Sequence, residues 1–433
     1  MRRLAVVPVT LWAFLLSVSL GFLIPGISAQ TSPSAQTPSN QRIVIAASRV
    51  LDGKGHVLEN QRIVIEGSKI VAVEPLGSGP VDYDLRGLTV LPGWIDAHVH
   101  ITWIFGKDGK NAGTDGTSQY DAYKAASNAW VTLMAGFTTV QSVGAPNDVT
   151  LRDAIDRGEI PGPRILTAVE PLVGKGEDTG TPDEIRAYIR KQKAAGADLI
   201  KIFASKSIRL GGGMTLSFEQ LSAACDEARK QGLRTLVHAY KEAVLAATLA
   251  GCTEVEHGTL AGEDALKAMA DKGTYLDPQA ALVIDNYLQH KEQYLGTEGY
   301  TAEGFAAMEK ILPEDCNIVR MAAKTRGLKV VFGTDAVAGA DGRNAEEFID
   351  RVNCGVDPMT AMVSANSLGA QAMGLSNQIG SIAPGMQADI IALDGDPIQD
   401  ITAVRRVVFV MKGGVVYKNV ARNAIPSYAG VKP

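Results

Sequence analysis

The chain has 433 residues, of which 46% are hydrophobic, so it can bury a sizeable core in one large domain or two medium ones. Its formal net charge of −5 provides no basic surface for nucleic acid, and this class of partner is excluded from our expectations. The charge indicates only a soluble and mildly acidic protein, and we expect membrane contact only through its N-terminal segment. The sequence leaves open whether the protein forms a homo-oligomer.

The N-terminal segment, residues 1–29, has the layout of a secretory signal peptide. Two arginines precede a long apolar stretch, and the small residues Ser28 and Ala29 indicate cleavage after Ala29. We therefore expect an exported protein, either periplasmic or secreted. The apolar stretch is also long enough to span a bilayer, so a retained anchor is the alternative. Residues 30–41 are rich in Ser, Thr, Pro and Gln, which predicts a disordered linker.

Four cysteines are present, and none of them belongs to a CxxC pair. An exported protein can oxidise its cysteines, but these four are widely spaced and two of them lie in helix-like stretches. We therefore expect buried free thiols at Cys225, Cys252, Cys316 and Cys354.

Short strand-like runs separated by turn residues occur toward both ends of the chain. Residues 42–92 contain "RIVIAASRVL" and "QRIVIEGSKIVAVEPL", and residues 376–425 contain "ADIIALDGDP" and "VRRVVFVMKGGVVYK". We predict one small β-sandwich domain assembled from these N- and C-terminal segments, followed by a C-terminal tail at 426–433.

The segment between them, residues 93–375, alternates short apolar runs with helical stretches such as "TPDEIRAYIRKQKAAG" and "SFEQLSAACDEARKQG". Eight strand–helix units in series favour an α/β fold, the (β/α)8 TIM barrel. An open doubly wound sheet is the competing fold, but it predicts a glycine fingerprint after the first strand, where this sequence has "HVHITW". The eight runs are "WIDAHVH", "GFTTVQSVG", "RILTAVE", "DLIKIF", "RTLVHAY", "TEVEHG", "TYLDP" and "KVVFGTDA".

Side chains that can bind a metal or titrate stand in five of these runs, at or near the run's end. Barrel enzymes carry their chemistry at the carboxyl ends of the strands, so we expect these side chains to meet at one rim. The first run ends with two histidines at positions i and i+2, which point to the same face of a strand. The six residues are His98, His100, Lys201, His238, His257 and Asp335.

Each of these residues also has a purely structural interpretation. The histidines can be hydrogen-bonded core residues, and Asp335 can cap the helix that follows it. Lys201 is the most unusual of the six, because an unpaired ammonium inside a strand is costly. It can form a salt bridge to Glu256 or Glu170, or it can add CO2 and become an anionic carbamate whose two oxygens bridge two cations.

The ordered set of motifs resembles the amidohydrolase superfamily over about residues 42–420. The motifs are "PGWIDAHVH", "DLIKIF", "VHAY", "EVEHG" and "FGTDA". Two further stretches, "LRDAIDRGEIPGPRI" and "GSIAPGMQADIIALDGDP", look like the imidazolonepropionase-like branch, which includes Xaa-Pro dipeptidases of the prolidase type and carboxypeptidase-type amidases. The chain departs from that branch at Gln141 and Ser142, where members tend to have Arg-Asp. It also lacks their Gly-His-Gly pattern after the third strand, and both departures bear on substrate recognition.

The resemblance implies a binuclear centre with two divalent metal ions, for which zinc is preferred and manganese, cobalt or iron stay open. It implies that Lys201 is N6-carboxylysine and bridges both metals together with a hydroxide. It also implies that Asp335 is the general base and then the general acid. Tyr240 is implied to contact the scissile carbonyl or the substrate carboxylate, with a packed aromatic ring as the alternative. The implied ligands are His98, His100 and Asp335 for the more buried metal, and His238 and His257 for the more exposed one.

The implied reaction is hydrolysis of an amide or peptide bond by the metal-bound hydroxide. The expected substrate is small and bears a carboxylate, such as an Xaa-Pro dipeptide or an N-acyl amino acid. Arg209, Lys206 and Arg343 are loop residues that can pair with this carboxylate, although such charges are more often simply solvated. A cyclic amide, lactone or organophosphate ester hydrolase is the alternative, since the same centre serves all three. A metal-free amidohydrolase-like scaffold is disfavoured because every ligand position is filled.

Overall fold

The computed structural model describes residues 42–113, 118–297 and 299–420. The predicted signal peptide, the predicted linker and the predicted C-terminal tail therefore lie outside the described residues. Within the described ranges, no helix is both long enough and apolar enough to cross a membrane.

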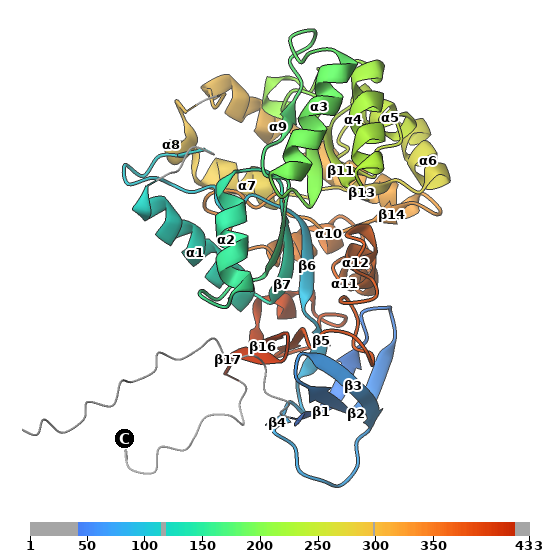
Figure 1. Ribbon diagram of the computed structural model, residues 1–433. Coiled ribbons are helices and arrows are strands. Elements are labelled where there is room, and N and C mark those ends of the chain that lie inside the picture. The colour runs from blue at the N-terminus through green and yellow to red at the C-terminus, as the bar shows by residue number, and fades with distance from the viewer. Residues whose placement is uncertain (1–41, 114–117, 298, 421–433) are drawn as a thin grey trace, which may run out of the picture. The chain divides into compact units, whose positions relative to one another are not determined.

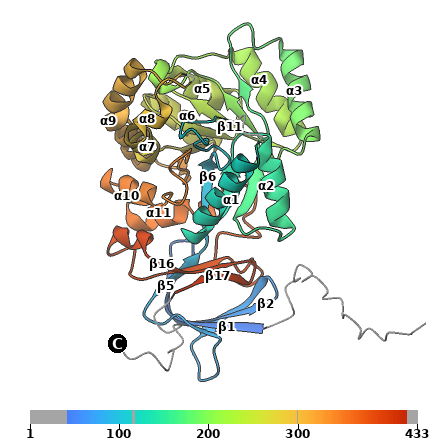
Figure 2. The same ribbon diagram turned by 90° about the vertical axis from the view of Figure 1, so that its left-hand side faces the viewer.

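Strands from the two predicted β segments lie in one eight-stranded sheet. Its order is β17-β16-β15-β5-β1-β2-β3, with β4 paired to β1. Figure 1 and Figure 2 both show the blue strands of the N-terminal segment beside the red strands of the C-terminal segment. The two groups meet at β5, which pairs with β1 on one side and with β15 on the other. The strands are β1 (Arg42–Leu51), β2 (Val57–Glu66), β3 (Lys69–Pro75), β4 (Tyr83–Asp84), β5 (Thr89–Pro92), β15 (Ile390–Leu393), β16 (Val407–Lys412) and β17 (Val415–Asn419).

The intervening strands form two parallel sheets, with the orders β6-β7-β8 and β14-β13-β12-β11-β10-β9. Each of the eight predicted apolar runs contains one of these strands, which confirms that part of the prediction, and β9 is an additional short strand. The strands are β6 (Trp94–Val99), β7 (Phe137–Ser142), β8 (Arg164–Thr167), β9 (Leu172–Val173), β10 (Leu199–Phe203), β11 (Arg234–Ala239), β12 (Glu254–His257), β13 (Tyr275–Asp277) and β14 (Lys329–Val330).

Backbone hydrogen bonds connect the two parallel sheets on both sides. On one side, the Ala97 N–H of β6 donates to the Phe332 carbonyl beyond β14 over 2.8 Å. On the other side, the N–H of Asp198, the residue before β10, donates to the Thr167 carbonyl of β8 over 2.8 Å. The strand ends that carry the predicted site residues therefore belong to neighbouring parallel strands.

Helices alternate with the parallel strands, and their ends follow ordinary capping rules. α3 and α4 each begin with a capping box, formed by Thr181 with Glu184 and by Ser217 with Gln220. α6 is followed by Gly273, whose φ of 73° is the left-handed conformation that glycine favours at helix ends. The helices are α1 (Gln119–Met134), α2 (Asn147–Asp156), α3 (Pro182–Ala194), α4 (Phe218–Lys230), α5 (Glu242–Leu249), α6 (Glu263–Lys272), α7 (Leu282–Gln289), α8 (Lys291–Tyr294), α9 (Ala302–Lys324), α10 (Glu346–Asn353), α11 (Pro358–Ser364) and α12 (Ser367–Ala372), with short 3₁₀ helices η1 (Ile208–Leu210) and η2 (Ile401–Arg405).

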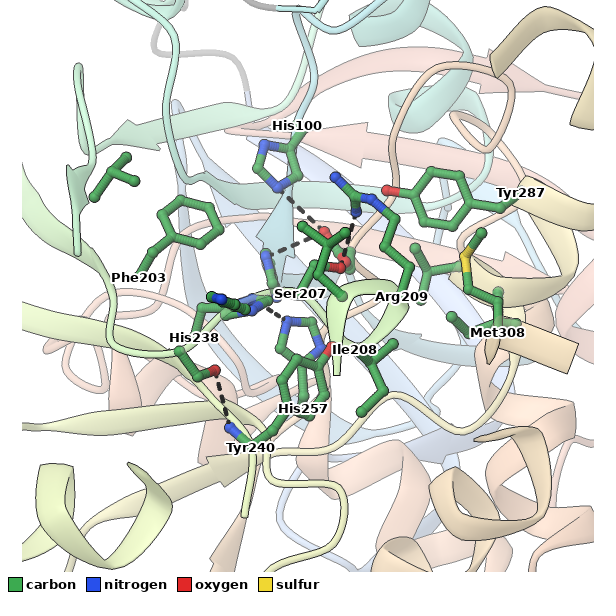
Figure 3. Close-up of a pocket in the computed structure, with 18 of the residues that line it drawn as sticks. His100, Phe203, Ser207, Ile208, Arg209, His238, Tyr240, His257, Tyr287 and Met308 are labelled. Carbon is green, nitrogen blue, oxygen red and sulfur yellow. Dashed lines mark hydrogen bonds and ion pairs between the residues drawn. The ribbon is translucent and has the colours of Figure 1, made fainter. Parts of the chain in front are cut away.

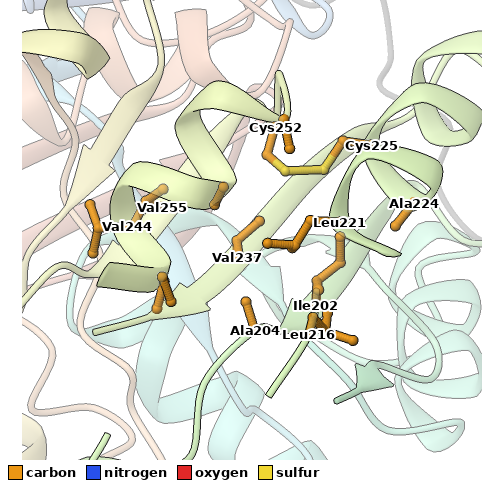
Figure 4. Packing of buried hydrophobic residues seen from close by; sticks show 14 of the residues in the cluster. Ile202, Ala204, Leu216, Leu221, Ala224, Cys225, Val237, Val244, Cys252 and Val255 are labelled. Atoms are coloured by element: carbon orange, nitrogen blue, oxygen red, sulfur yellow. A yellow bond between two sulfur atoms is a disulfide. The ribbon is translucent and has the colours of Figure 1, made fainter. Parts of the chain in front are cut away.

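The prediction of four free thiols is wrong, because the cysteines form two disulfides. Cys225 pairs with Cys252, and Cys316 pairs with Cys354, with Cα atoms 5.1 and 5.3 Å apart. Figure 4 shows the first bridge among buried aliphatic side chains, where it joins α4 to the chain segment after α5. The sequence separations of 27 and 38 residues misled the prediction. Successive strand–helix units lie side by side, so residues about one unit apart become neighbours in space.

Candidate metal centre and active-site cavity

All six predicted centre residues line one cavity at the carboxyl ends of the parallel strands (Figure 3). The cavity has a volume of about 320 Å³. Neighbouring parallel strands end at the same edge, so residues far apart in the sequence reach the same space. His98 and His100 come from the end of β6, Lys201 from β10, His238 from β11, His257 from β12, and Asp335 from the segment beyond β14.

Asp335 joins the two histidines at the end of β6. Its Oδ1 lies 3.2 Å from Nε2 of His98 and 3.1 Å from Nε2 of His100. Ligand atoms of these three side chains all lie within 4.8 Å of one another, which is close enough to surround one cation. Both imidazoles thus reach the same side of the strand, as their i, i+2 spacing predicts.

His238 and His257 form a second pair beside the first group. Nδ1 of His238 lies 2.9 Å from Nε2 of His257. The ring centroids of His98 and His257 are 5.5 Å apart, and Nζ of Lys201 lies 3.3 Å from Nε2 of His98. The six side chains therefore form one continuous cluster.

Burial lowers the pKa of three histidines of the centre. It lowers the pKa of His100 and brings the pKa of His257 down to about 3. Burial and the neighbouring His257 hold the pKa of His238 well below its usual range. Neutral imidazole is the form that binds metal ions. At Asp335, burial favours a higher pKa, but the charge of His98 and the hydrogen bond from His100 outweigh it, and the pKa stays below the usual range.

Two of the centre residues have a backbone conformation that is uncommon outside glycine. The φ angle is 67° at His257 and 51° at Asp335. A non-glycine residue in this region costs on the order of 1–3 kcal/mol, and such residues concentrate at functional sites. His257 is the last residue of β12 and Asp335 lies in the segment beyond β14, and both side chains line the cavity.

The donor atoms of this cluster fit divalent transition metals. Imidazole nitrogens and carboxylate oxygens are zinc ligands, and neutral imidazole also suits the neighbouring transition metals. Nδ1 of His100 and Nε2 of His238 are buried, and no residue in the described ranges gives them a hydrogen-bond partner. Buried polar atoms without a partner are rare, so these nitrogens point to a group that the chain itself does not supply.

The structure contains one of the two salt bridges considered for Lys201. Its Nζ lies 3.0 Å from Oε2 of Glu256, and neither side chain is exposed to solvent. The same oxygen contacts Nδ1 of His98. Glu170, the other predicted partner, instead lies near Lys191. Glu256 therefore belongs to the centre, although the sequence suggested it only as a structural partner of Lys201.

Two further buried carboxylates near the centre, Asp277 and Glu347, share a single cation, Arg351. Asp277 at the end of β13 lies 3.7 Å from Nδ1 of His98 through its Oδ2, while its Oδ1 pairs with Arg351 at 3.1 Å. Arg351 also pairs with Glu347 at 2.9 Å. Since Glu256 pairs with Lys201 and Asp277 pairs with Arg351, these buried carboxylates form an ion-pair network that supports the centre.

Of the residues predicted to contact substrate, Tyr240 and Lys206 line the cavity and Arg343 does not. The Tyr240 ring stacks on His257 with a centroid distance of 5.0 Å and an interplanar angle of 14°. Arg343 donates a hydrogen bond to the Gln289 side chain over 2.8 Å, and the structure does not bring it to the site.

Arg209 also lines the cavity and is held there by neutral partners. Its Nε donates to the Gly299 carbonyl and its Nη1 donates to Ser207 Oγ, each over 2.9 Å. The guanidinium lies over the Tyr300 ring, 4.1 Å from the centroid. Within the described residues, no carboxylate forms a salt bridge with Arg209, so its charge is available to an anionic ligand.

A large apolar surface on one side of the cavity was missed by the sequence analysis. Figure 3 shows Tyr287 and Met308 on the same side as Arg209. The long segment after the seventh strand supplies this surface, and its helical pattern did not reveal which side chains face the cavity. We call it the apolar wall, formed by Val283, Ile284 and Tyr287 of α7, Tyr300, and Met308 of α9.

Buried imidazoles, a lysine and a carboxylate at the ends of parallel strands define a metal-dependent hydrolase class. The chain belongs to the Amidohydrolase family, which it matches over residues 89–417, and it is a hydrolase that acts on C–N bonds. The predicted family resemblance is thus confirmed.

Named relatives give this family membership more detail. Ochratoxinase of Aspergillus niger is 27% identical over 443 aligned positions, which cover 89% of this chain and 88% of the relative. The crystal structure of a Xaa-Pro dipeptidase with methionine bound in its active site has a TM-score of 0.78 at 29% identity, covering 88% of this chain and 100% of that one. A prolidase complexed with N-methylphosphonate-L-proline has a TM-score of 0.77 at 27% identity, with the same coverage.

Proposed function

We propose that this protein is an exported binuclear-metal amidase that cleaves the amide or peptide bond of a small substrate bearing a carboxylate. The observation that carries this proposal is the convergence of six side chains, separated by up to 237 residues in sequence (335 − 98), in one cavity. β6, β10, β11, β12 and the segment beyond β14 supply donors that fit divalent metals, and a cationic arginine lies at the same cavity.

We infer that the parallel strands close into a (β/α)8 barrel over residues 93–375. The hydrogen bonds from Ala97 to Phe332 and from Asp198 to Thr167 support closure because they join the two sheets on both sides. Segments 42–92 and 376–420 then form the small β-sandwich domain of the enzyme, and residues 421–425 of the predicted second segment lie outside the described residues.

In the proposed centre, two divalent ions share the six side chains, and zinc is the metal that best suits the donors. Such ions lower the pKa of a water molecule and polarise a carbonyl oxygen. Lys201, in its N6-carboxylysine form, would hold both ions. His98, His100 and Asp335 would hold one ion with it, and His238 and His257 would hold the other.

Asp335 is the residue we assign to proton transfer. Its carboxylate is ionised and lies between the two β6 histidines, so it can accept the proton of the attacking water and return it to the departing nitrogen. Burial holds the pKa of Tyr240 well above its usual range, so its hydroxyl keeps its proton. This hydroxyl can donate a hydrogen bond to an oxygen of the scissile carbonyl or of the substrate carboxylate.

The shape and charge of the cavity support a substrate with a carboxylate and an apolar side chain. Arg209 presents a guanidinium without a described salt-bridge partner, and guanidinium binds carboxylate in a bidentate manner. The apolar wall beside it buries hydrocarbon or aromatic surface. A dipeptide or an N-acyl amino acid combines both groups within one small molecule, as the names of the dipeptidase and prolidase relatives also suggest.

Export is supported by the cysteines as well as by the composition of residues 1–29. Both disulfides need an oxidising compartment to form and persist. The periplasm or the extracellular space meets this requirement.

A substrate screen tests the proposal directly. The enzyme loaded with zinc or manganese is incubated with a library of dipeptides and N-acyl amino acids, and release of a free amine is scored. We expect hydrolysis of carboxylate-bearing members and none of the matching amides that lack the carboxylate. Equal rates for both sets would show that the enzyme does not require a carboxylate on its substrate. No amine release with any metal would contradict the amidase assignment.

A further inference from the structure

Glu256 makes a contact that a simple salt bridge with Lys201 does not explain. It stands on β12 directly before His257, and its side chain is wholly buried. Its Oε2 lies 3.0 Å from Nζ of Lys201 and also contacts Nδ1 of His98. Its Oε1 has no hydrogen-bond partner in the described part of the chain. A single oxygen atom therefore faces two residues of the proposed centre.

We propose that Glu256 is a positioning residue, whose Oε2 orients both His98 and the carboxylated form of Lys201. The inference rests on the proposed function, because it concerns the bridging form of this lysine.

For His98, the contact selects the tautomer. The contact is an ion pair, because Nδ1 of His98 has no hydrogen-bond partner in the described part of the chain. A carboxylate on the Nδ1 side nevertheless favours the tautomer that carries its proton on Nδ1 and keeps its lone pair on Nε2. The Nε2 of His98 is the atom that faces Asp335, at 3.2 Å. Glu256 thus directs the ligating nitrogen of His98 toward the centre.

For Lys201, the contact supplies an acceptor that the carboxylated side chain needs. When the neutral amine adds CO2, a new N–C bond forms, one proton is released, and the resulting carbamate keeps one N–H. This N–H is fully buried, and a buried donor without an acceptor costs about 1–3 kcal/mol.

Two described side-chain atoms lie within hydrogen-bonding distance of Lys201 Nζ, and they are Nε2 of His98 and Oε2 of Glu256. A metal ion takes the lone pair of His98, so the N–H is left with Glu256. The same nitrogen of Lys201 therefore contacts Glu256 in both forms of the side chain, as an ammonium in the salt bridge and as the N–H of the carbamate. The observed salt bridge is thus compatible with carboxylation.

The chain offers a matched control two residues earlier on the same strand. Glu254 is as buried as Glu256, yet neither of its carboxylate oxygens has a hydrogen-bond partner within the described ranges. Burial raises the pKa of Glu254 to about 8, so it is largely uncharged at pH 7. Replacing either residue with leucine makes the same chemical change on the same strand, but only one of the two variants removes the shared oxygen.

The experiment compares wild type, Glu256→Leu, Glu256→Gln and Glu254→Leu in full-length protein. Carboxylation is read from the ¹³C NMR signal of the carbamate after incubation with ¹³C-bicarbonate and zinc. Metal affinity is read from a competition titration with a chelator, and thermal unfolding reports folding. We expect Glu256→Leu to lose the carbamate signal and to bind metal about 10–100-fold more weakly, which is the usual effect of removing a hydrogen-bond partner of a metal ligand. Glu256→Gln retains an acceptor oxygen and should keep the signal, and Glu254→Leu should match wild type.

The following results would overturn the inference. If Glu256→Leu keeps the wild-type signal and affinity, Glu256 positions neither residue. If Glu254→Leu loses as much carbamate signal and metal affinity as Glu256→Leu, the loss results from disturbing the strand and not from removing the shared oxygen. If Glu256→Leu does not fold, Glu256→Gln decides, because loss of its carbamate signal contradicts the acceptor role. A wild-type enzyme that binds two zinc ions without a carbamate signal contradicts the proposed bridge itself, and the inference fails with it.

Discussion

The cavity has two sides with different origins. The side that we propose to bind metal consists of the six residues on or just beyond the parallel strands, which occupy fixed places in the strand–helix repeat. The apolar wall and Arg209 come instead from segments that connect the strands, namely the segment from α7 to α9 and the loop after β10. The comparison teaches that bond cleavage depends on the regular part of the fold, while the choice of substrate depends on its connecting segments. Changes on the first side should lower kcat, and changes on the second side should alter KM or substrate preference.

The largest expected effect on activity is at Asp335. Asp335→Asn removes the proton acceptor but keeps an oxygen beside His98 and His100, so we expect kcat to fall by about 10²–10⁴-fold, the usual contribution of general acid–base catalysis. Much of the bound metal should remain. Steady-state kinetics together with metal analysis of the same preparation check this, and unchanged turnover would exclude Asp335 as the proton carrier.

A smaller effect, confined to binding, is expected at Arg209. Arg209→Met should raise KM for carboxylate substrates about 10–100-fold with kcat nearly unchanged, because a hydrogen bond to a charged group is worth about 1.5–3 kcal/mol. Arg343→Met is the matched control, since Arg343 bonds Gln289 outside the cavity lining. Equal shifts in both variants would show that Arg209 has no special role in substrate binding.

A still smaller effect is expected at the apolar wall. Met308→Ala should reduce the preference in kcat/KM for a bulky apolar substrate side chain over alanine by about tenfold, in line with the loss of roughly 1–3 kcal/mol of pocket contact. Met321→Ala is a control on the same helix, because Met321 packs in the core away from the cavity. The account of the wall is wrong if both variants keep the wild-type preference.

The smallest effect on activity is expected at the disulfide that anchors α9. Cys316 lies in this helix, and Cys354 follows α10. Replacing both with serine should lower the free energy of unfolding by about 2–4 kcal/mol while kcat stays near the wild-type value. Chemical denaturation and kinetics measure the two quantities. A wild-type stability in the variant would contradict a disulfide at this position.

The sequence correctly predicted that the six residues meet in one place, because each of them stands in a strand motif. Strand ends are recognisable from apolar runs, and histidine, lysine and aspartate at those ends are unusual enough to be noticed. His98 and His257, for example, needed no knowledge of the loops to be placed at the same rim.

The sequence predicted only part of the other side, namely Arg209, for physical reasons that differ by residue. Tyr287 and Met308 face the cavity because of the way α7 and α9 pack, and the helical pattern alone does not reveal this. Arg209 and Arg343 looked equivalent as loop cations, and only the fold separates them. The sequence suggested Glu256 as a salt-bridge partner of Lys201, but its contact with His98 was not foreseen, because the two residues are distant in the chain and become neighbours only when the strands assemble.

The central claim is that the six side chains together hold two divalent ions bridged by Lys201. Metal content per chain, measured by inductively coupled plasma mass spectrometry on wild type and Lys201→Ala after zinc loading and removal of free metal, tests it most directly. The account predicts two zinc ions per wild-type chain, with metal content and turnover both sharply lower in the variant. Two ions per chain and full activity in Lys201→Ala would contradict it.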